Sequence, residues 1–272
     1  MPAISPYTET TIEDVIDVQI VPIASQMRFI DEMKRSLEYF FRRGTGSYSD
    51  HFGDRAAVNF PFKGFVLSGP PGNGKTEAVR IVFRDLWDSL NNEKITLRLF
   101  HINAADVNRS GVGDIERNIR RIFRDAKDKG ANTRTILLFD DIETLIVARR
   151  DDHTTEWSRA ANGVFFHELD RLSSDDTLVV ATTNEPDLID PAIHSRLSMR
   201  KVPEPDLEEM LQVAQACLPN SQHANLPSRD KLMGKIQSNI ESAISEGTEG
   251  ASFRLARKAA IEVLIAEVVG WR

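Results

Sequence analysis

The stretch GPPGNGKT, Gly69 to Thr76, constrains the fold of this chain more than any other feature. It matches the pattern G-x-x-x-x-G-K-[ST], and it stands between an apolar run that predicts a strand and an amphipathic run that predicts a helix. Its glycines allow backbone N–H groups to turn inward around phosphate oxygens, and the helix that follows points its positive dipole end to the same place. The stretch therefore predicts a phosphate-binding loop in an α/β domain.

The loop pattern gives each of its polar side chains a chemical task. Lys75 would reach the β- and γ-phosphates of a nucleoside triphosphate, and Thr76 would offer its hydroxyl to a Mg²⁺ ion. We therefore expect the chain to bind ATP or GTP. The residues expected around the phosphates are Gly69, Pro70, Pro71, Gly72, Asn73, Gly74, Lys75, Thr76 and Glu77.

The second half of the expected site lies in ILLFDDIETL, Ile136 to Leu145. Four apolar residues lead to Asp140, which should emerge at the carboxyl end of a central strand, where sheets of this kind bind ligands. A carboxylate there suits a role on the magnesium ion through its water shell. Asp141 would orient the attacking water, with one methylene less reach than a glutamate. The alternative for both is an acidic loop start without a role.

A further polar residue stands at a strand end in LVVATTN, where Asn184 follows six residues typical of a buried strand. A neutral amide at this point could hold the lytic water and contact the γ-phosphate without adding negative charge. Taken alone, an asparagine after a strand is more often a turn former. Beside the loop and the acidic pair, we expect Asn184 to be catalytic.

Short apolar runs alternate with amphipathic runs through the middle of the chain. Strands are predicted over 64–69, 96–103, 135–140 and 177–183, and helices over 26–43, 76–90, 114–130 and 157–172. After Pro203 and Pro205 only helical periods follow, over 206–217, 229–245 and 251–269. Such alternation is typical of a parallel sheet covered on both faces.

The expected fold class is therefore α/β. It consists of a three-layer αβα phosphate-loop domain with a parallel five-stranded sheet, followed by a small all-helical lid domain. The expected boundaries are an extended N-terminal segment over 1–24, the large domain over 25–203 and the lid over 204–272.

Composition limits the classes of protein to which the chain can belong. Its 272 residues carry a formal net charge of −7, which argues against a protein coated for nucleic acid but not against a local basic patch. Its one cysteine, Cys217, excludes an internal disulfide. The N-terminal residues do not have the pattern of a signal peptide, and no apolar run is long enough to span a membrane. We expect a soluble, cytoplasmic protein.

Four ordered motifs, GPPGNGKT, GVGDIERNIRRIF, LLFDDIE and VVATTNEPDLIDPAIHSR, resemble the AAA+ ATPases of the classic remodelling type over roughly residues 60–270. The resemblance implies ATP and Mg²⁺ as cofactors and a homo-oligomer, typically a hexameric ring with its sites between subunits. It implies Arg196 as an arginine finger supplied in trans, with Arg200 as the alternative. Asn103 resembles the polar switch residue that holds the catalytic acid until substrate arrives.

Two further stretches, IETLIVARR and GASFRLARK, are similar to the ATPases that remodel HORMA-domain proteins. This narrower resemblance implies that Arg254, two residues after Ser252, faces the γ-phosphate from the lid; the alternative is a solvated helix residue. It also implies a protein client, such as a HORMA-domain protein, and in bacteria a place in antiviral signalling.

The chain departs from these families at two points. Threading machines place an aromatic residue before V-G in a pore loop, where this sequence has Gly111. Either Val112 and Arg109 supply the grip, or substrate moves without tight threading. The part before the ATPase core is also short, about 60 residues, whereas eukaryotic HORMA remodellers carry a larger recruiting domain there. A compact bacterial relative is one explanation.

The expected function is that of an ATP-hydrolysing ring that remodels or disassembles a partner protein. One alternative is a nucleic-acid-associated initiator or helicase loader, because such proteins often carry a paired Asp-Asp and because the run 117–124 is basic. The net charge and the lack of a DNA-binding motif after residue 206 argue against it, so nucleic acid is an unlikely partner. Further alternatives are an unfoldase that serves a protease and a slow ATP-dependent switch.

Overall fold

The computed structural model describes residues 5–16, 21, 23–43, 62–108, 114–127, 130, 132–148, 156–219 and 227–269. The chain divides into two compact units. The first consists of Met1–Val18, Phe29–Ser68 and Lys75–Lys201, and the second of Gln19–Arg28, Gly69–Gly74 and Val202–Arg272.

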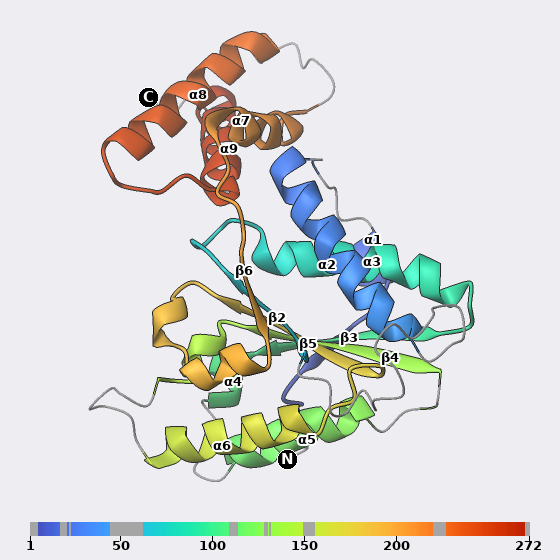
Figure 1. The fold of residues 1–272 in the computed structure, drawn as a ribbon. Helices are drawn as coiled ribbons and strands as arrows, with labels where there is room; N and C mark the ends of the chain where they lie inside the picture. Colours follow the sequence, from blue (N-terminus) through green and yellow to red (C-terminus); the bar gives the residue numbers. More distant parts are fainter. Residues whose placement is uncertain are drawn as a thin grey trace. The chain divides into compact units, whose positions relative to one another are not determined.

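The first unit contains a six-stranded sheet with the order β1-β3-β4-β5-β2-β6 (Figure 1). The strands are β1 Thr8–Thr10, β2 Gly64–Ser68, β3 Thr96–Asn103, β4 Thr133–Asp140, β5 Thr177–Thr183 and β6 Ser198–Lys201. The five strands from β3 to β6 in this order pair in parallel, as expected, whereas β1 pairs antiparallel with β3. The sheet thus has one strand more than the expected five.

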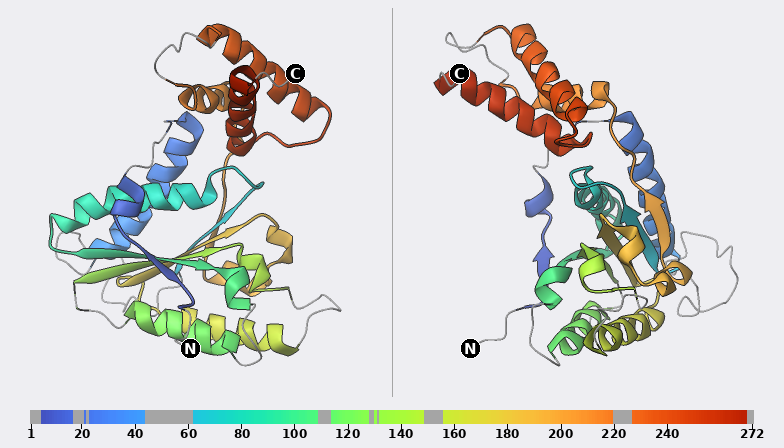
Figure 2. Two further views of the ribbon diagram at one scale, coloured as in Figure 1. Left: turned by 180° about the vertical axis from the view of Figure 1, so that it is seen from behind. Right: turned by 90° about the vertical axis from the view of Figure 1, so that its left-hand side faces the viewer.

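Helices cover both faces of this sheet, so the expected three-layer arrangement is confirmed (Figures 1 and 2). One face carries α2 and α3, and the other carries α5 and α6. The helices are α1 Glu13–Ile16, α2 Ala24–Arg42, α3 Lys75–Asn91, α4 Ala104–Asn108, α5 Asp114–Lys127 and α6 Glu156–Asp170. Three short 3-10 turns follow strands, namely η2 Ile142–Thr144, η3 Pro186–Leu188 and η4 Pro191–Ser195.

The core on the α5 and α6 side is built around three phenylalanines. The ring of Phe139 on β4 lies 5.4 Å from that of Phe165 on α6 and 6.1 Å from that of Phe123 on α5, and all three side chains are fully buried. Such aromatic packing buries much apolar area and holds β4 against both helices. The rigid strand fixes the position of Asp140 and Asp141 at its carboxyl end.

The N-terminal segment, expected to be extended, supplies the edge strand β1 and the one-turn helix α1. The Tyr7 ring stacks on Phe100 with 4.1 Å between the ring centroids, and its hydroxyl donates to Asp125 Oδ2 over 3.1 Å. Thr11 and Asp14 hydrogen-bond through the backbone and side chain at the start of α1. The Tyr7 contacts attach the segment to β3 and α5.

The second unit contains the helices α7 Leu207–Ala216, α8 Arg229–Ser245 and α9 Phe253–Val269, which confirms the helical C-terminal region. Its core joins residues of all three helices, among them Met210, Ile236, Ile240, Leu255 and Ala260. A capping box fixes the start of α7, because Asp206 accepts from the N–H of Glu209 while the Glu209 carboxylate accepts from the N–H of Asp206. Ile23, which directly precedes α2, also belongs to this core.

Within the part of the chain that the structure describes, none of the helices combines the length and the apolar character that crossing a membrane requires.

Candidate active site

The stretch Gly69–Thr76, hereafter the phosphate loop, joins β2 to α3 as its sequence pattern predicts. Gly72 has a φ of 86° and Gly74 a φ of 78°, values that favour glycine. A Cβ atom at Gly72 would also come 2.7 Å from the Cβ of Arg254 in the same unit. The loop conformation therefore needs a glycine at position 72 for two independent reasons.

Asn73 indicates that the loop is shaped for a polar ligand. Its side chain is 0% exposed, and neither its amide nitrogen nor its amide oxygen has a hydrogen-bond partner among the described residues. Buried amide groups in folded proteins are nearly always paired, because an unpaired one keeps its desolvation cost. A bound nucleotide with its water shell would supply both donors and acceptors here.

Asp140 receives three side-chain hydrogen bonds at the carboxyl end of β4. Thr76 Oγ1 and Thr182 Oγ1 both donate to its Oδ1 over 2.8 Å, and His101 Nε2 lies 2.6 Å from its Oδ2. The structure thus brings together the two residues expected on magnesium, Thr76 from α3 and Asp140 from β4. His101 and Thr182 were not singled out from the sequence.

The surroundings of Asp140 keep it ionised. Burial alone would raise the pKa of this carboxyl group, but the hydrogen bonds from His101, Thr76 and Thr182 outweigh burial and hold the pKa below its usual value. A carboxylate that is charged at neutral pH and hydrogen-bonded to a threonine hydroxyl suits a magnesium water shell.

A metal at this point would depend on the nucleotide for most of its ligands. Among the described residues, no three side chains of the His, Cys, Asp and Glu types form a group that could hold a metal ion. Mg²⁺ commonly binds through one or two protein oxygens together with waters and substrate phosphates. The pair Thr76 and Asp140 fits that mode, with phosphates supplied by the loop's ligand.

Asn184 connects the phosphate loop to the second acid. Its Oδ1 accepts from Lys75 Nζ over 2.7 Å, and its Nδ2 donates to Asp141 Oδ1 over 3.1 Å. Lys75 is buried, whereas Asp141 is exposed. One amide thus bridges the lysine expected on the phosphates and the acid expected on the water.

Asp141 has an unusual backbone for a non-glycine residue, with φ and ψ both at 52°. The left-handed conformation ends β4 and begins η2, and the Asp141 N–H donates to Thr182 Oγ1 over 3.2 Å. Aspartate tolerates this conformation better than most residues. The turn leaves the Asp141 side chain exposed at the end of the sheet, one residue after Asp140.

Arg196, expected as an arginine finger, is paired within its own chain. Its Nε and Nη2 donate to the two carboxylate oxygens of Asp170 over 2.6 and 2.8 Å, and its guanidinium lies 5.0 Å from the centroid of the Phe166 ring. The hydrogen bond to Asp170 raises the pKa of Arg196 and lowers that of Asp170. Such a bidentate pair fixes the direction of the guanidinium.

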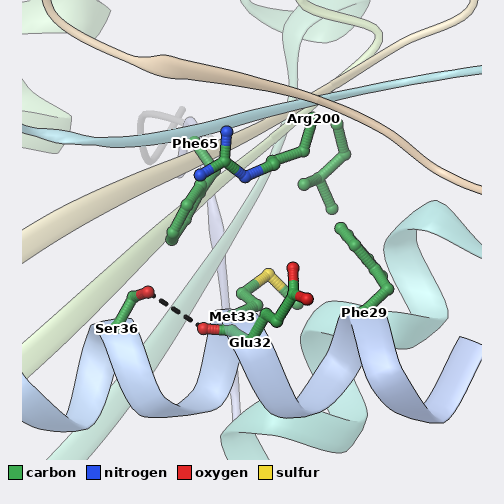
Figure 3. A pocket seen from close by; sticks show the side chains of 7 residues that line it. Phe29, Glu32, Met33, Ser36, Phe65 and Arg200 are labelled. Atoms are coloured by element: carbon green, nitrogen blue, oxygen red, sulfur yellow. Dashed lines mark hydrogen bonds between the residues drawn. The ribbon is translucent and has the colours of Figure 1, made fainter.

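The alternative finger, Arg200, is exposed on β6 and lies over the Phe65 ring at 5.8 Å. It lines a small pocket together with residues of α2 and β2 (Figure 3). No residue of the phosphate loop contributes to this pocket, which is lined by Phe29, Glu32, Met33, Ser36, Phe65, Leu67 and Arg200.

Asn103, expected as a switch residue, stands at the end of β3 opposite Asp140 in the parallel register. Its Oδ1 accepts from the N–H of Ala105 over 3.0 Å, which caps the short helix α4. Glu77 lies in the first turn of α3, 3.7 Å from Arg80.

Arg254 lies in the first turn of α9, where Ser252 Oγ accepts from the N–H of Leu255 over 3.1 Å as a cap. The Arg254 N–H donates to the carbonyl of Gly72 over 3.3 Å, so the helix start contacts the phosphate loop within the second unit. Its side chain is exposed, and among the described residues it has no hydrogen-bond or ion-pair partner. The expected pore-loop residues Arg109, Gly111 and Val112 lie outside the described residues, as do Arg149 and Arg150.

Sequence reasoning also missed Glu143, which lies on η2 two residues after Asp141. Its Oε1 accepts from the backbone N–H of Asn184 over 3.1 Å. The only sequence signal is a further acid in the same short stretch, DDIE, after the buried strand.

The model of the family described as "ATPase family associated with various cellular activities (AAA)" matches residues 65–203. The chain belongs to this AAA family. The matched range runs from β2 to the segment after β6, and it includes the phosphate loop, both acids, Asn184 and Arg196. The chain therefore carries an ATPase domain of the AAA type.

Curated relatives of this AAA domain come from animals and bacteria. "ATPase family gene 2 protein homolog B" of Bos taurus is 29% identical over 75% of the chain, and "Proteasome-associated ATPase" of Salinispora arenicola is also 29% identical over 75%. "AAA ATPase forming ring-shaped complexes" of Bifidobacterium animalis subsp. lactis is 30% identical over 67%. The AAA chain spans only 25%, 35% and 33% of the length of these relatives.

A solved structure shares the fold over nearly its whole length. One chain of "Structure of E. coli MS115-1 HORMA:CdnC:Trip13 complex" superposes with a TM-score of 0.65, and the match covers 94% of each chain at 18% identity. At this identity the similarity establishes the fold alone.

Proposed function

We propose that this chain is a Mg²⁺-dependent ATPase that assembles into a ring, typically a hexamer, and remodels or disassembles a partner protein. The bridge that Asn184 makes between Lys75 and Asp141 is the observation that carries the proposal. It places a phosphate-binding cation, a neutral amide and an exposed acid in one connected group beside the Thr76 and Asp140 pair. These are groups that ATP hydrolysis uses from within one chain.

Each group has a task in the proposed reaction. Lys75 would bind the β- and γ-phosphate oxygens, and Thr76 and Asp140 would hold Mg²⁺. Bound Mg²⁺ would neutralise the charge that develops on the phosphates. Asp141 accepts a hydrogen bond from the attacking water and orients it, while the Asn184 amide fixes the position of Asp141. Because Asp141 is exposed and held by a single side-chain hydrogen bond, a water can reach its free oxygen.

Assembly into a ring would complete the site. We propose that Arg196 acts in trans, as the arginine finger of a neighbouring subunit, and that Arg254 contacts the γ-phosphate from the lid. The bidentate contact with Asp170 supports a guanidinium held in one direction, ready for a partner's nucleotide. A relative named for forming ring-shaped complexes supports oligomerisation. We propose domain boundaries of 25–203 and 204–272, with the segment 1–24 in front, and a cytoplasmic location.

The proposed client is a HORMA-domain protein. Support comes from the resemblance of IETLIVARR and GASFRLARK to HORMA remodellers, and from a fold shared with a chain of a complex whose name includes HORMA. The exposed, unpartnered Arg254 side chain against the phosphate loop is the feature that this resemblance requires. The helicase-loader alternative has less support, because Arg117, Arg121 and Arg124 on α5 pair with acids of the same helix.

A trapping experiment tests the client. Asp141→Asn should bind ATP without turning it over, and should therefore hold a bacterial HORMA-domain protein through gel filtration with ATP but not with ADP. Lys75→Ala, which lacks the phosphate-binding cation, is the matched control and should hold none. If Asp141→Asn binds ATP and still retains no HORMA-domain protein, the proposed client is wrong although the ATPase assignment stands.

A further inference from the structure

We propose that Glu143 is a positioning residue for ATP hydrolysis, which it supports by fixing the backbone of Asn184. The proposal rests on the proposed function, because it assigns Asn184 to the reacting site. It concerns a half-buried carboxylate on η2 that the catalytic scheme does not otherwise use.

The turn η2 holds Glu143 in one place. Ile142 is fully buried, and the Thr144 hydroxyl and N–H both donate to the Asp141 carbonyl, over 2.9 and 3.0 Å. The N–H groups of Leu145 and Ile146 donate in turn to the carbonyl of Ile142. With its backbone closed on itself in this way, the turn aims the Glu143 side chain at the end of β5.

Asn184 directly follows the end of β5, where strand pairing no longer holds its backbone. The strand ends at Thr183, whose register partner on β2 is Ser68, so the Asn184 N–H lies beyond the ladder. Glu143 Oε1 accepts that N–H over 3.1 Å. A charged acceptor makes a stronger bond to a backbone N–H than a carbonyl does. The contact therefore replaces the missing ladder bond and restrains the Asn184 backbone.

Fixing the backbone fixes the side chain. The Asn184 amide must present Oδ1 to Lys75 and Nδ2 to Asp141 at the same time, over 2.7 and 3.1 Å. A rotation of the Asn184 peptide would break one of the two contacts. Glu143 thus acts on the reaction through Asn184, and through it on the direction of both Lys75 and Asp141.

The second carboxylate oxygen of Glu143 indicates that the residue is not placed for stability alone. Glu143 Oε2 is buried and has no hydrogen-bond partner among the described residues. A buried, unpaired carboxylate oxygen opposes folding, because the group loses its hydration without compensation. The bond from the Asn184 N–H to Oε1, rather than any stabilising contact of Oε2, therefore accounts for a carboxyl side chain at this position.

The test compares Glu143→Ala and Glu143→Gln with the wild type in ATP turnover, affinity for a fluorescent ATP analogue and melting temperature. Glu143→Ala should lower kcat between about tenfold and about 100-fold, as expected for a misplaced catalytic group, with nucleotide affinity unchanged. Glu143→Gln keeps an oxygen that accepts the Asn184 N–H and should restore most of the turnover. Asp88→Ala removes an exposed acid on α3 and should match the wild type.

Other results would overturn the proposal. A wild-type kcat in Glu143→Ala would show that Asn184 needs no support from this side chain. Equal losses of kcat, affinity and melting temperature would show a merely structural role. A Glu143→Gln variant as slow as Glu143→Ala, with intact affinity, would mean that the charge itself acts on the reaction. A wild type without ATP turnover would instead contradict the proposed function.

Discussion

The two adjacent aspartates at the end of β4 have opposite environments, and this difference assigns their tasks. Asp140 is surrounded by three donors and holds a lowered pKa, which suits a fixed negative charge beside a metal. Asp141 is exposed and takes one hydrogen bond, from Asn184. One acid is therefore immobilised, and the other keeps an oxygen free for a water.

A substitution of Asp141 should change ATP turnover rather than ATP binding. Asp141→Asn keeps the shape of the side chain but removes its capacity to accept a proton, so kcat should fall at least about 100-fold. The affinity for an ATP analogue should stay within error of the wild type. Stopped-flow binding and steady-state phosphate release measure the two quantities. An Asn variant that turns over ATP normally would remove Asp141 from the mechanism.

Thr182 links the two acids, because its hydroxyl donates to Asp140 and accepts from the Asp141 N–H. Thr182→Val keeps the shape but removes both bonds, at a cost of about 1.5–3 kcal/mol for the bond to the charged group. We expect a lower melting temperature and a higher Mg²⁺ concentration for half-maximal turnover. A Mg²⁺ titration of turnover and a thermal melt, each against Thr96→Val at the exposed start of β3, test this.

The same change predicts a pH effect. The folded-state pKa of Asp140 lies below its unfolded value, so its contribution to stability is present above the unfolded pKa and is lost as pH falls through the folded pKa. Thr182→Val removes one of the hydrogen bonds that lower this pKa. The loss of stability in acid begins at the unfolded pKa in both proteins, but in the variant it should be smaller and complete at a higher pH than in the wild type, as thermal melts over a pH series would measure.

At the scale of elements, long periodic segments could be predicted from the sequence and short ones could not. The helices α3, α8 and α9 and the strands β3 and β5 fall where apolar periodicity places them. The strands β1 and β6 have three and four residues, too few to show an apolar period. They form strands because β1 pairs with β3 and β6 pairs with β2. The register between paired strands depends on tertiary contacts, so a local sequence pattern does not predict it.

The residues of the candidate site also divide into those that a sequence motif predicts and those that it does not. Lys75, Thr76, Asp140, Asp141 and Asn184 stand in short motifs, and the structure brings them together at the ends of β4, β5 and the phosphate loop. The supporting residues His101, Glu143, Asp170 and Thr182 have no motif of their own. They are defined by which side chain they contact across 26 to 42 positions of sequence. Such contacts exist only once the sheet has formed.

A substitution at Gly72 tests the role of the phosphate loop in ATP binding. Gly72→Ala places a Cβ 2.7 Å from that of Arg254 and at a φ of 86°, so the loop or the start of α9 must move. We expect a large loss of ATP affinity, measured by calorimetry. Gly163→Ala in α6 is the matched control, because its Cβ meets nothing within 4 Å and alanine stabilises a helix interior by about 0.5–1 kcal/mol. Unchanged affinity in Gly72→Ala would contradict the role given to the loop.

At the scale of the whole molecule, the proposed chemistry is incomplete in one chain. Arg196 pairs with Asp170 of its own chain, whereas Lys75, Asn184 and Asp141 form a separate connected group. A finger supplied by a neighbour would make turnover a property of the assembly. Loss of such a finger typically lowers turnover about 10³–10⁵-fold.

The most direct measurement of the central claim is ATP turnover per subunit as a function of protein concentration, in Mg²⁺ and in excess chelator, for the wild type and Arg196→Ala. We predict Mg²⁺-dependent turnover that falls as dilution separates the subunits, and an Arg196→Ala protein that binds ATP but is nearly inactive at every concentration. Turnover per subunit that stays constant on dilution, with Arg196→Ala as active as the wild type, would contradict a ring ATPase with shared sites.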